Sequence, residues 1–340
     1  MRLAIWPQRH WVPFFSVIIA TRNRPEQFRH ALDSVLRQSC SDTEVVVVND
    51  GSDSEHQFEY ESIFRSVDPV RLRLVTLCHS PNGHGGGYAR NFGAANAIGP
   101  YLCFLDDDDC WTDSDHLQRA KAVIEDADAV DLYMTNQAAF FRGERKPGPI
   151  WIEDLPGILA RLQNWPDHRG IHTVTVDELL KSRGFCHLNG LIVRKALYEE
   201  IGGMEEAIRW EEDRDFYLRL IDRATVVKYA PITIARHNIP DPAKKSSLTT
   251  SLSELQRRLF QIMVLDRALC FARHPAIRSY ARRHKAYALR RVAEALAAEG
   301  RYAEAALYAG QAFSVSLTVK WAGYSAWLTL RSKLSKCSTA

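Results

Sequence analysis

The stretch Tyr101–Trp111 (YLCFLDDDDCW) decides the fold, because a short apolar run passes directly into four consecutive aspartates. Two earlier runs have the same design: FSVIIA at Phe15–Ala20 is followed by TRNR, and EVVVV at Glu44–Val48 is followed by NDGS. Continuous apolar runs of this length are typical of strands that are covered on both faces. A polar cluster therefore follows the carboxyl end of each of three predicted strands.

Helical patterns separate these strands. Phe28 and Leu32, for example, follow Pro25 at the spacing of one helix face. Strands that alternate with helices predict an α/β fold with a mostly parallel, doubly wound sheet. Such sheets bind their ligands beyond the carboxyl ends of the strands, where the three polar clusters fall. The sequence therefore predicts a site for a nucleotide-sized ligand at that edge.

Length and composition exclude several classes of protein. The chain has 340 residues, of which 46% are hydrophobic and 25% charged, so it is long enough for two domains and apolar enough to bury a core. Its seven cysteines are scattered without a CxxC pair, which argues against a disulfide framework or a zinc site. Because it lacks an apolar run of about 18 residues and a secretory signal pattern, we expect a cytoplasmic protein.

Charge is divided unevenly along the chain. Residues 244–340 contain 17 basic and 5 acidic residues, a net charge of +12, whereas residues 1–243 have a net charge of −9. We assign residues 1–243 to a ligand-binding α/β domain and residues 244–340 to a basic α-helical extension, with a polar linker at Pro240–Ser247 across the boundary. Residues 137–190 are rich in Gly, Pro and Trp and are expected to face the substrate.

The four aspartates Asp106–Asp109 are the strongest chemical signal. Like charges this close raise one another's pKa unless a cation lies between them. Mg²⁺ and Mn²⁺ prefer such oxygen ligands and bridge to phosphate. The pattern therefore predicts a site for a metal ion and a diphosphate, and the alternative is a solvated acidic turn that caps the next helix.

Four single residues have both a functional and a structural interpretation. Asp50 can accept hydrogen bonds from a base or a ribose, or stabilise its own turn before Gly51. Arg90, after the loop NGHGGGY, can contact a phosphate or base, or lie on a helix surface. Asp213 can act as a general base, since an apolar helix face raises its pKa, or stabilise a helix N-terminus as an anion. His237 can bind a metal or a phosphate, or be structural.

Six segments in order resemble the family 2 glycosyltransferases, which have the GT-A fold. The segments are Phe15–Arg24, Val46–Ser52, Ala89–Gly93, Tyr101–Trp111, Asn189–Gly203 and Glu212–Leu220. The likeness spans about residues 14–240 and leaves the last hundred residues outside it. It implies a Rossmann-like GT-A domain whose mostly parallel sheet is flanked by helices, with the helical extension added at the C-terminus and an acceptor-side region at residues 137–190.

The resemblance also implies roles for individual residues. Thr21 and Asp50 would hold the base and the ribose, with Arg90 nearby. Asp106 and Asp108 would be the two acids of a DxD motif, although Asp107 and Asp109 leave the working pair open. The residues assigned are Thr21, Arg24, Asp50, Arg90, Asp106 and Asp107 for the nucleotide sugar, Asp106, Asp108 and His237 for a Mn²⁺ or Mg²⁺ ion, and Asp213 for the catalytic base.

The reaction expected from this resemblance is the transfer of one sugar, with inversion, from a UDP-, dTDP- or GDP-linked donor to a hydroxyl of a glycan or lipid-linked glycan. The processive-synthase signature QxxRW is absent from the sequence, which favours single-sugar transfer. Two other classes remain open. A sugar nucleotidyltransferase would release diphosphate instead of a nucleoside diphosphate, and a non-catalytic scaffold of the same fold would turn over no nucleotide sugar.

The basic extension has three interpretations. Trp321, Tyr324 and Trp327 precede Arg331 and Lys333, a mixture that suits an interfacial helix at the anionic inner face of a membrane. The alternatives are that the extension docks on the acidic domain or joins two copies of the chain as a homo-oligomer. The extension matches no nucleic-acid-binding module, so we expect no nucleic-acid partner.

Overall fold

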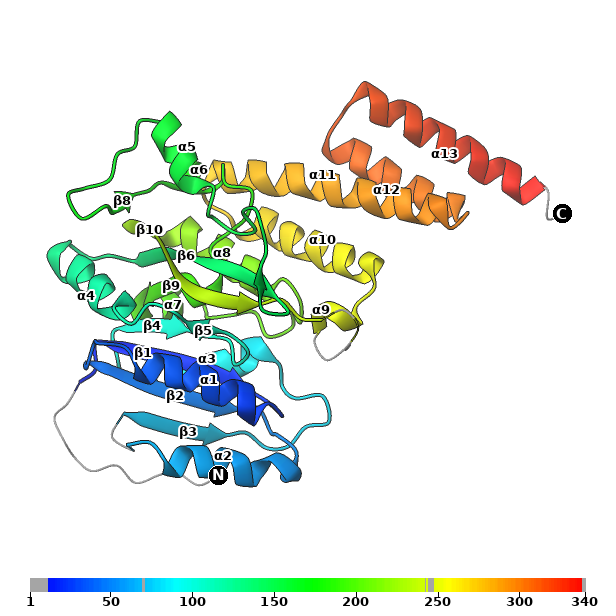
Figure 1. Cartoon of the computed structure of the whole chain (residues 1–340). Helices are drawn as coiled ribbons and strands as arrows, with labels where there is room; N and C mark the ends of the chain where they lie inside the picture. The colour runs from blue at the N-terminus through cyan, green and yellow to red at the C-terminus, as the bar shows by residue number, and fades with distance from the viewer. Residues whose placement is uncertain (1–11, 69–70, 242, 244–247, 338–340) are drawn as a thin grey trace. The chain divides into compact units, whose positions relative to one another are not determined.

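The computed structural model describes residues 12–68, 71–241, 243 and 248–337 (Figure 1). The chain divides into two compact units, residues 1–241 and 242–340. The first unit is built around a sheet and the second consists of helices. The expectations placed on the first eleven residues and on part of the Pro240–Ser247 linker lie outside the described residues.

One sheet runs through the first unit. Its strands, in spatial order, are β3 (Leu72–Thr76), β2 (Thr43–Asn49), β1 (Phe15–Thr21), β4 (Tyr101–Phe104), β9 (Leu191–Arg194), β6 (Leu132–Phe141), β10 (Val227–Asn238) and β5 (Cys110–Trp111). The first four pair in parallel, as do β6 and β10. In contrast, β9 is antiparallel to both of its neighbours, and β5 is antiparallel to β10. Two short strands, β7 (Glu144–Arg145) and β8 (His172–Thr173), pair with β6 and β10.

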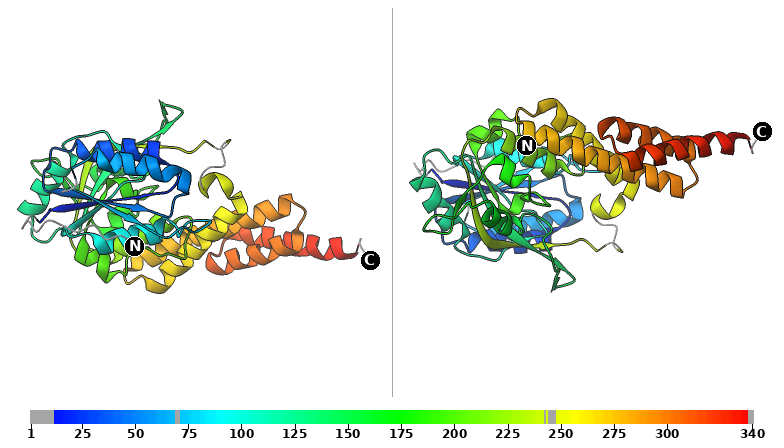
Figure 2. Two further views of the ribbon diagram at one scale, coloured as in Figure 1. Left: turned by 90° about the horizontal axis from the view of Figure 1, so that it is seen from below. Right: turned by 90° about the horizontal axis from the view of Figure 1, so that it is seen from above.

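Helices cover both faces of this sheet (Figure 2). They are α1 (Pro25–Leu36), α2 (Ser54–Arg65), α3 (Gly86–Asn96), α4 (His116–Asp126), α5 (Leu155–Arg161), α6 (Val176–Leu179), α7 (Lys195–Glu200) and α8 (Glu212–Arg223). In β1, Val17 and Ile19 share a core with Phe28 of α1, whereas Ile18 lies against Gly93 of α3. Successive strand side chains point to opposite faces, so β1 is buried on both, which explains its continuous apolar run.

Residues 137–190 differ most from the sequence-based expectation. The pattern predicts a strand that ends at Thr135, but β6 continues to Phe141, and the segment beyond it contains β7, α5, β8 and α6. Two short strands are predicted between Val226 and Ala235, whereas the structure has the single strand β10 with register shifts after Ala230. A bulge bends a strand without ending it, so the hydrophobic pattern is broken where the strand is not.

The second unit is helical, as the sequence predicts. Its helices are α9 (Leu248–Ser251), α10 (Glu254–Phe271), α11 (Pro275–Ala298), α12 (Tyr302–Val315) and α13 (Val319–Cys337). Its core combines small residues of α12, such as Ala305 and Ala309, with Leu289 of α11 and Leu328 of α13. Small side chains on one helix allow its neighbours to pack closely. Among the helices that the structure describes, none is both long and apolar enough to cross a lipid bilayer.

Candidate functional site at the strand ends

The carboxyl ends of β1 and β2 lie side by side, as the parallel register requires. Thr21 is in register with Asn49, and the backbone N–H of Asp50 donates to the carbonyl of Thr21 at 2.9 Å. The buried Thr21 hydroxyl lies 2.7 Å from the Tyr60 hydroxyl, which also accepts a hydrogen bond from the backbone N–H of Arg24. The two strand-end loops are therefore tied together from both the backbone and the side chains.

Asp50 anchors the glycine-rich loop that precedes α3. Its carboxylate accepts hydrogen bonds from the backbone N–H groups of His84 and Gly85, and it lies 2.7 Å from His84 Nδ1. Gly83 is at φ +63°, and a Cβ there would come within 2.7 Å of the Asp50 carboxylate. A side chain at position 83 would therefore be strained and would displace this contact. The structure places Asp50 next to the loop that the sequence analysis singled out.

Two arginines hold the acidic cluster after β4. Arg24 Nη1 lies 3.3 Å from Asp107 Oδ1 and 3.0 Å from Asp108 Oδ2. Arg90 of α3 donates to Asp106 Oδ1 at 2.5 Å. These contacts bring together five of the residues assigned from the sequence, from two loops and the helix α3. The interpretation of Arg90 as a surface helix residue is wrong, because its side chain is largely buried in an ion pair.

The four aspartates differ in protonation behaviour although they are adjacent. Burial alone would raise the pKa of Asp106, but the charge of Arg90 and its hydrogen bond lower it to about 2. Burial, followed by repulsion from Asp107 and Asp109, raises the pKa of Asp108 to about 7. The pKa of Asp108 stays raised although Arg24 lies 3.0 Å away, and the pKa of its neighbour Asp107 is raised as well. Arg24 therefore does not fully balance the negative charge of the cluster. A bound cation would supply that balance.

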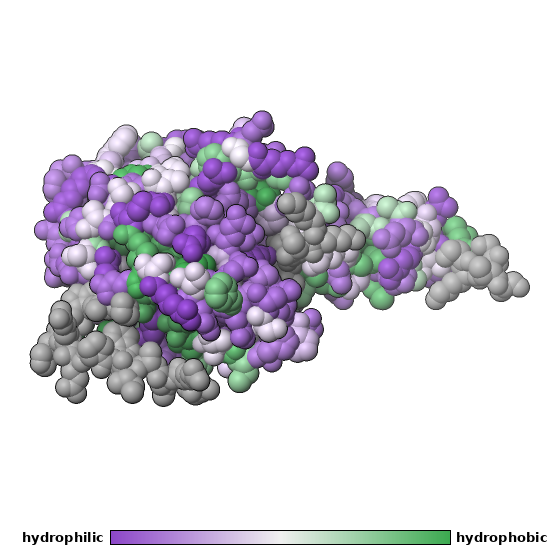
Figure 3. Space-filling model, turned by 60° about the horizontal axis from the view of Figure 1, so that its bottom comes forward, coloured by the Kyte–Doolittle hydropathy of each residue, from purple (hydrophilic) through white to green (hydrophobic). Residues whose placement is uncertain are grey.

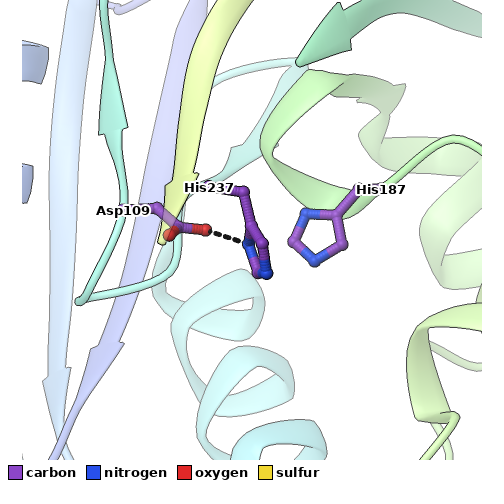
Figure 4. Close-up of side chains that lie close together, drawn as sticks. All are labelled: Asp109, His187 and His237. Carbon is purple, nitrogen blue, oxygen red and sulfur yellow. Dashed lines mark hydrogen bonds and ion pairs between the residues drawn. The ribbon is translucent and has the colours of Figure 1, made fainter. Parts of the chain in front are cut away.

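Asp109, His187 and His237 form a second cluster beside these acids (Figure 4). One ligand atom from each lies within 4.8 Å of the others. His237 Nδ1 is 2.7 Å from Asp109 Oδ2, and the His187 ring centre is 5.1 Å from that of His237. Although burial lowers the pKa of His237, its hydrogen bond with Asp109 raises it to about 9. Burial lowers the pKa of His187 to about 4, which keeps this imidazole neutral.

Among the described residues, the side chains of Asp109, His187 and His237 lie close enough together to hold one metal ion, and Asp106 and Asp108 are not part of this set. Of the three predicted metal ligands, His237 belongs to the histidine cluster, whereas Asp106 and Asp108 belong to the acidic cluster next to it; His187 Nε2 lies 3.7 Å from Asp106 Oδ2 and joins the two. Asp109 is hydrogen-bonded to His237 Nδ1, which is the arrangement by which a carboxylate commonly orients a metal-ligating histidine. Carboxylate oxygens with imidazole nitrogens fit Mn²⁺ better than Mg²⁺, which prefers oxygen ligands alone.

Asp213 lies in the first turn of α8, next to Glu212. Burial and the charge of Glu211 raise the pKa of Asp213 to about 6, and burial and the charge of Asp213 raise that of Glu212 to about 8. Arg90 Nη1 is 3.8 Å from Glu212 Oε1, so the start of α8 is coupled to the Arg90–Asp106 pair. Glu211 precedes the helix at φ +66°, a conformation that is costly for a non-glycine residue and is concentrated at functional sites.

Asp215 and Arg219 form a helix pair within α8. Their spacing of four residues predicts such a pair, and the structure confirms it: the Asp215 side chain accepts a hydrogen bond from Arg219 Nε at 2.8 Å and is fully buried. Arg219 also donates to the backbone carbonyls of Ile201 and Gly203. The pair therefore fixes the loop before α8 against the helix. Helical spacing shows which residues are neighbours, but not which face the loop covers.

The sequence analysis missed His187 and Asn189. Asn189 Nδ2 donates to Asp109 Oδ2 at 2.6 Å, and its carbonyl accepts from the indole N–H of Trp111. Both residues lie just before β9, which pairs with β4, so their position follows from an antiparallel pairing that periodicity does not reveal. Asn189 opens one of the six segments that resemble the family, which was the signal available for this region.

Comparison with known proteins places the chain in a family. Residues 16–202 match the sequence model described as Glycosyl transferase family 2. A PGL/p-HBAD biosynthesis glycosyltransferase of Mycobacterium bovis is 30% identical over 227 residues, which cover 66% of this chain and 77% of that protein. An uncharacterized glycosyltransferase of Haemophilus influenzae is 23% identical over 254 residues, which cover 72% of this chain and 74% of that protein.

Two solved structures share the fold. S. aureus TarS in complex with UDP-GlcNAc matches with a TM-score of 0.58 and 19% identity, over 90% of this chain and 76% of that one. The mannosyltransferase PcManGT from Pyrobaculum calidifontis, in complex with GDP-Man and Mn²⁺, matches with a TM-score of 0.58 and 17% identity, over 98% and 89%. The expected α/β GT-A fold with C-terminal helices is confirmed.

Proposed function

Because the chain belongs to glycosyl transferase family 2, we propose that it transfers a single sugar from a nucleoside diphosphate sugar to an acceptor hydroxyl, in a metal-dependent displacement that inverts the anomeric carbon. The observation that carries the proposal is the meeting of Arg24, Arg90, the acidic cluster and two histidines at the ends of the parallel strands. The similar structures of TarS and PcManGT hold UDP-GlcNAc and GDP-Man, which supports a nucleotide sugar as donor.

The nucleotide end of the donor is assigned to the β1 and β2 ends. Thr21 and Asp50 lie there with the glycine-rich loop, and in this position they can accept hydrogen bonds from a base and a ribose. Arg24 and Arg90 flank the acidic cluster and face the place where a diphosphate would lie beside its metal ion. Asp106, Asp108 and His237 would hold Mn²⁺ or Mg²⁺, with Asp109 orienting His237. When bound, the ion balances the charge that develops on the leaving diphosphate.

Asp213 is assigned as the general base. A carboxylate with a pKa of about 6 is ionised at neutral pH but basic enough to take a proton from an attacking hydroxyl. At the start of α8, the Arg90 guanidinium lies close to the carboxyl group of Glu212, the residue before Asp213. The acceptor oxygen attacks the anomeric carbon as its proton passes to Asp213, and the bond to the diphosphate breaks. One displacement on the face opposite the leaving group inverts the configuration.

The proposal is tested by binding and product analysis. A thermal-shift panel of UDP, dTDP and GDP, each with and without Mn²⁺, should show one nucleotide that raises the melting temperature more with the metal, because a ligand that binds the native state stabilises it. Incubation with the matching nucleotide sugar should then release nucleoside diphosphate. Release of inorganic diphosphate would indicate the nucleotidyltransferase alternative, and no turnover of any nucleotide sugar would indicate the scaffold.

The second unit is proposed to contact an anionic membrane surface from the cytoplasmic side, where a lipid-linked acceptor would be presented. Val319, Trp327, Leu330 and Leu334 of α13 are exposed, α13 has basic but no acidic residues, and the helices of this unit carry hydrophobic surface next to hydrophilic surface (Figure 3). Apolar and aromatic residues with cations suit an anionic bilayer surface. Trp321 belongs to the core instead, where its indole N–H donates to the Ala309 carbonyl.

Vesicle co-sedimentation tests this contact. Vesicles that contain phosphatidylglycerol should bind the full chain, phosphatidylcholine vesicles should bind it much less, and L330E should weaken binding about tenfold because a charge replaces an exposed apolar contact. L307E on α12, where Leu307 is also exposed, is the matched control. Equal effects of both variants, or a concentration-dependent dimer that L330E disrupts, would favour the homo-oligomer alternative.

A further inference from the structure

The residues between β6 and β9 enclose two adjoining hollows. One, of about 470 Å³, is lined mainly by α5 and the segment after α6, and the other, of about 540 Å³, by the end of β6 and the segment around β7. Pro149 and Asp154 line both, so the hollows form one continuous surface. The nucleotide, metal and base assignments above use none of the residues that line it.

The cations that line this surface exceed the acids available to pair with them. The lining basic residues are Arg145, Lys146, Arg161, Lys181 and Arg183. Both acidic residues of the lining already accept hydrogen bonds. Glu153 accepts from the backbone N–H groups of Ile150 and Trp151, and Asp154 accepts from the Ser182 hydroxyl and the Arg183 backbone N–H.

Several of these cations have no anionic partner. Among the side chains that the structure describes, no ion pair reaches Arg145, Lys146, Arg161 or Arg183; Lys146 lies over the Phe141 ring, with its amine 4.8 Å from the ring centre. Residues 1–243, by contrast, have a net charge of −9. Unpaired guanidinium groups on an otherwise acidic unit are suited to bind anionic groups, since each arginine can offer paired donors to a phosphate or carboxylate.

The hollows adjoin the strand-end site. Trp151, between the two segments that line them, packs its ring against both His187 and His237, with ring centres 5.7 and 5.0 Å apart. Ala139, which lines the second hollow, is in register with His237 on β10. A ligand in the hollows would therefore lie one layer of side chains from the histidine cluster, on the side opposite the nucleotide assignment at β1 and β2.

The walls are held in place before any ligand binds. Gly184 packs so closely on the 150–151 backbone that a Cβ would come within 2.4 Å of the Trp151 carbonyl. The Ser182 hydroxyl is fixed by Asp154 at 2.6 Å. Walls that need no rearrangement reduce the free energy that binding must supply.

We propose that this surface is the acceptor subsite and that it selects a sugar chain carrying anionic groups, phosphate, sulfate or carboxylate, which pair with Arg145, Lys146, Arg161 and Arg183. The assignment as an acceptor subsite rests on the proposed function. The binding of an anionic sugar chain does not, because it requires neither a nucleotide nor a metal.

The test compares the full chain with R161Q/R183Q in EDTA and low salt. The probes are fluorescent dextran sulfate and neutral dextran of the same length, and binding is followed by anisotropy. The wild type should bind dextran sulfate and not dextran, and R161Q/R183Q should bind it about tenfold more weakly. R29Q/R37Q removes the exposed Arg29 of α1 and the exposed Arg37 directly after that helix, with the same change in net charge, and it should change binding less than twofold.

Equal losses in both double variants would mean that only net charge matters and would overturn the proposal, as would a wild type that binds both dextrans alike or neither. Binding to phosphatidylglycerol vesicles that R161Q/R183Q abolishes, without binding to dextran sulfate, would place a lipid headgroup here and overturn it too. The thermal shift with nucleotide and Mn²⁺ tests the proposed function separately. R161Q/R183Q should leave that shift unchanged.

Discussion

At the strand ends the charged side chains hold one another, whereas the charged side chains of the hollows between β6 and β9 do not. Asp50 accepts hydrogen bonds from backbone amides of the glycine-rich loop, and Asp106 accepts one from an arginine. Asp109 accepts one from an asparagine and is hydrogen-bonded to a histidine. Arg161 and Arg183 are exposed, and neither has such a partner among the side chains that the structure describes. The side chains of the strand-end site are therefore fixed in advance by one another, whereas the proposed acceptor subsite leaves its cations available to a ligand.

The largest effect is expected at the base. Asp213→Asn removes the proton acceptor but keeps the size of the side chain, so transfer should fall about 10³-fold or more, while nucleotide binding with Mn²⁺ stays close to that of the wild type. Product release under saturating donor and a parallel thermal shift measure the two quantities. Near-normal turnover in this variant would mean that another group, such as Glu212, takes the proton.

Breaking the buried pair of α8 tests how much the held charges contribute to stability. Asp215→Asn removes a fully buried carboxylate and leaves the mostly buried Arg219 side chain without its counter-charge, and we expect the free energy of unfolding to fall by about 3 kcal/mol or more. Glu61→Gln, in an exposed pair with Arg65 of α2, is the matched control and should change it by less than about 1 kcal/mol. Urea denaturation of both variants provides the comparison, and equal changes would contradict it.

Asp109 should matter through His237. In Asp109→Asn the amide is a weaker partner for His237 Nδ1, so Mn²⁺ affinity should fall about 10- to 100-fold, measured by titration calorimetry with the nucleoside diphosphate present. Asp128→Asn makes the same carboxylate-to-amide change at an exposed position and should have no measurable effect. If Asp109→Asn bound Mn²⁺ as tightly as the wild type, Asp109 would have no role in orienting the histidine.

Lowering the pH should switch the base off earlier than for an ordinary aspartate. Burial and the charge of Glu211 raise the pKa of Asp213 to about 6, and only its ionised form accepts a proton. The rate of transfer should therefore be high above pH 6 and fall about tenfold per pH unit below it, where an ordinary carboxylate with a pKa near 4 would still be ionised. A rate profile from pH 5 to 8 that stays flat would contradict this assignment.

The smallest effect is expected where charges are unpaired. Arg161→Gln removes an exposed cation without an ion-pair partner among the described residues, so the free energy of unfolding should change by less than about 0.5 kcal/mol. Chemical denaturation checks this value against the much larger loss in Asp215→Asn. A loss of several kcal/mol would show that Arg161 is structural, and the contrast between the two regions would disappear.

Much of the nucleotide half of the site follows from the sequence. A parallel strand that is buried on both faces is recognisable from its apolar run, and its carboxyl end then positions Thr21, Asp50 and Asp106 without knowledge of side-chain contacts. Arg24 and Arg90 were assigned with them, and the structure brings both to the acidic cluster.

His237 was assigned from the sequence, but the position of His187 could not be predicted in the same way. His187 reaches the cluster because the short strand β9 runs antiparallel between β4 and β6, and four residues of strand carry too little periodicity to reveal that pairing. The burial of Asp215 could not be predicted for a related reason, since the loop at Ile201–Gly203, which Arg219 holds, lies beside it. Long-range pairing, rather than local pattern, determines these positions.

The position of β9 has a consequence for how this enzyme could be altered. The segment between β6 and β9 starts and finishes on adjacent strands, because β9 pairs with β6 itself. Replacing its residues 142–186 with a longer or shorter segment would change the closure free energy only slowly and would leave the strand ends that hold Thr21 and Asp50 intact. We therefore expect that residues 142–186 can be exchanged between relatives while His187 and Asn189 stay in the recipient.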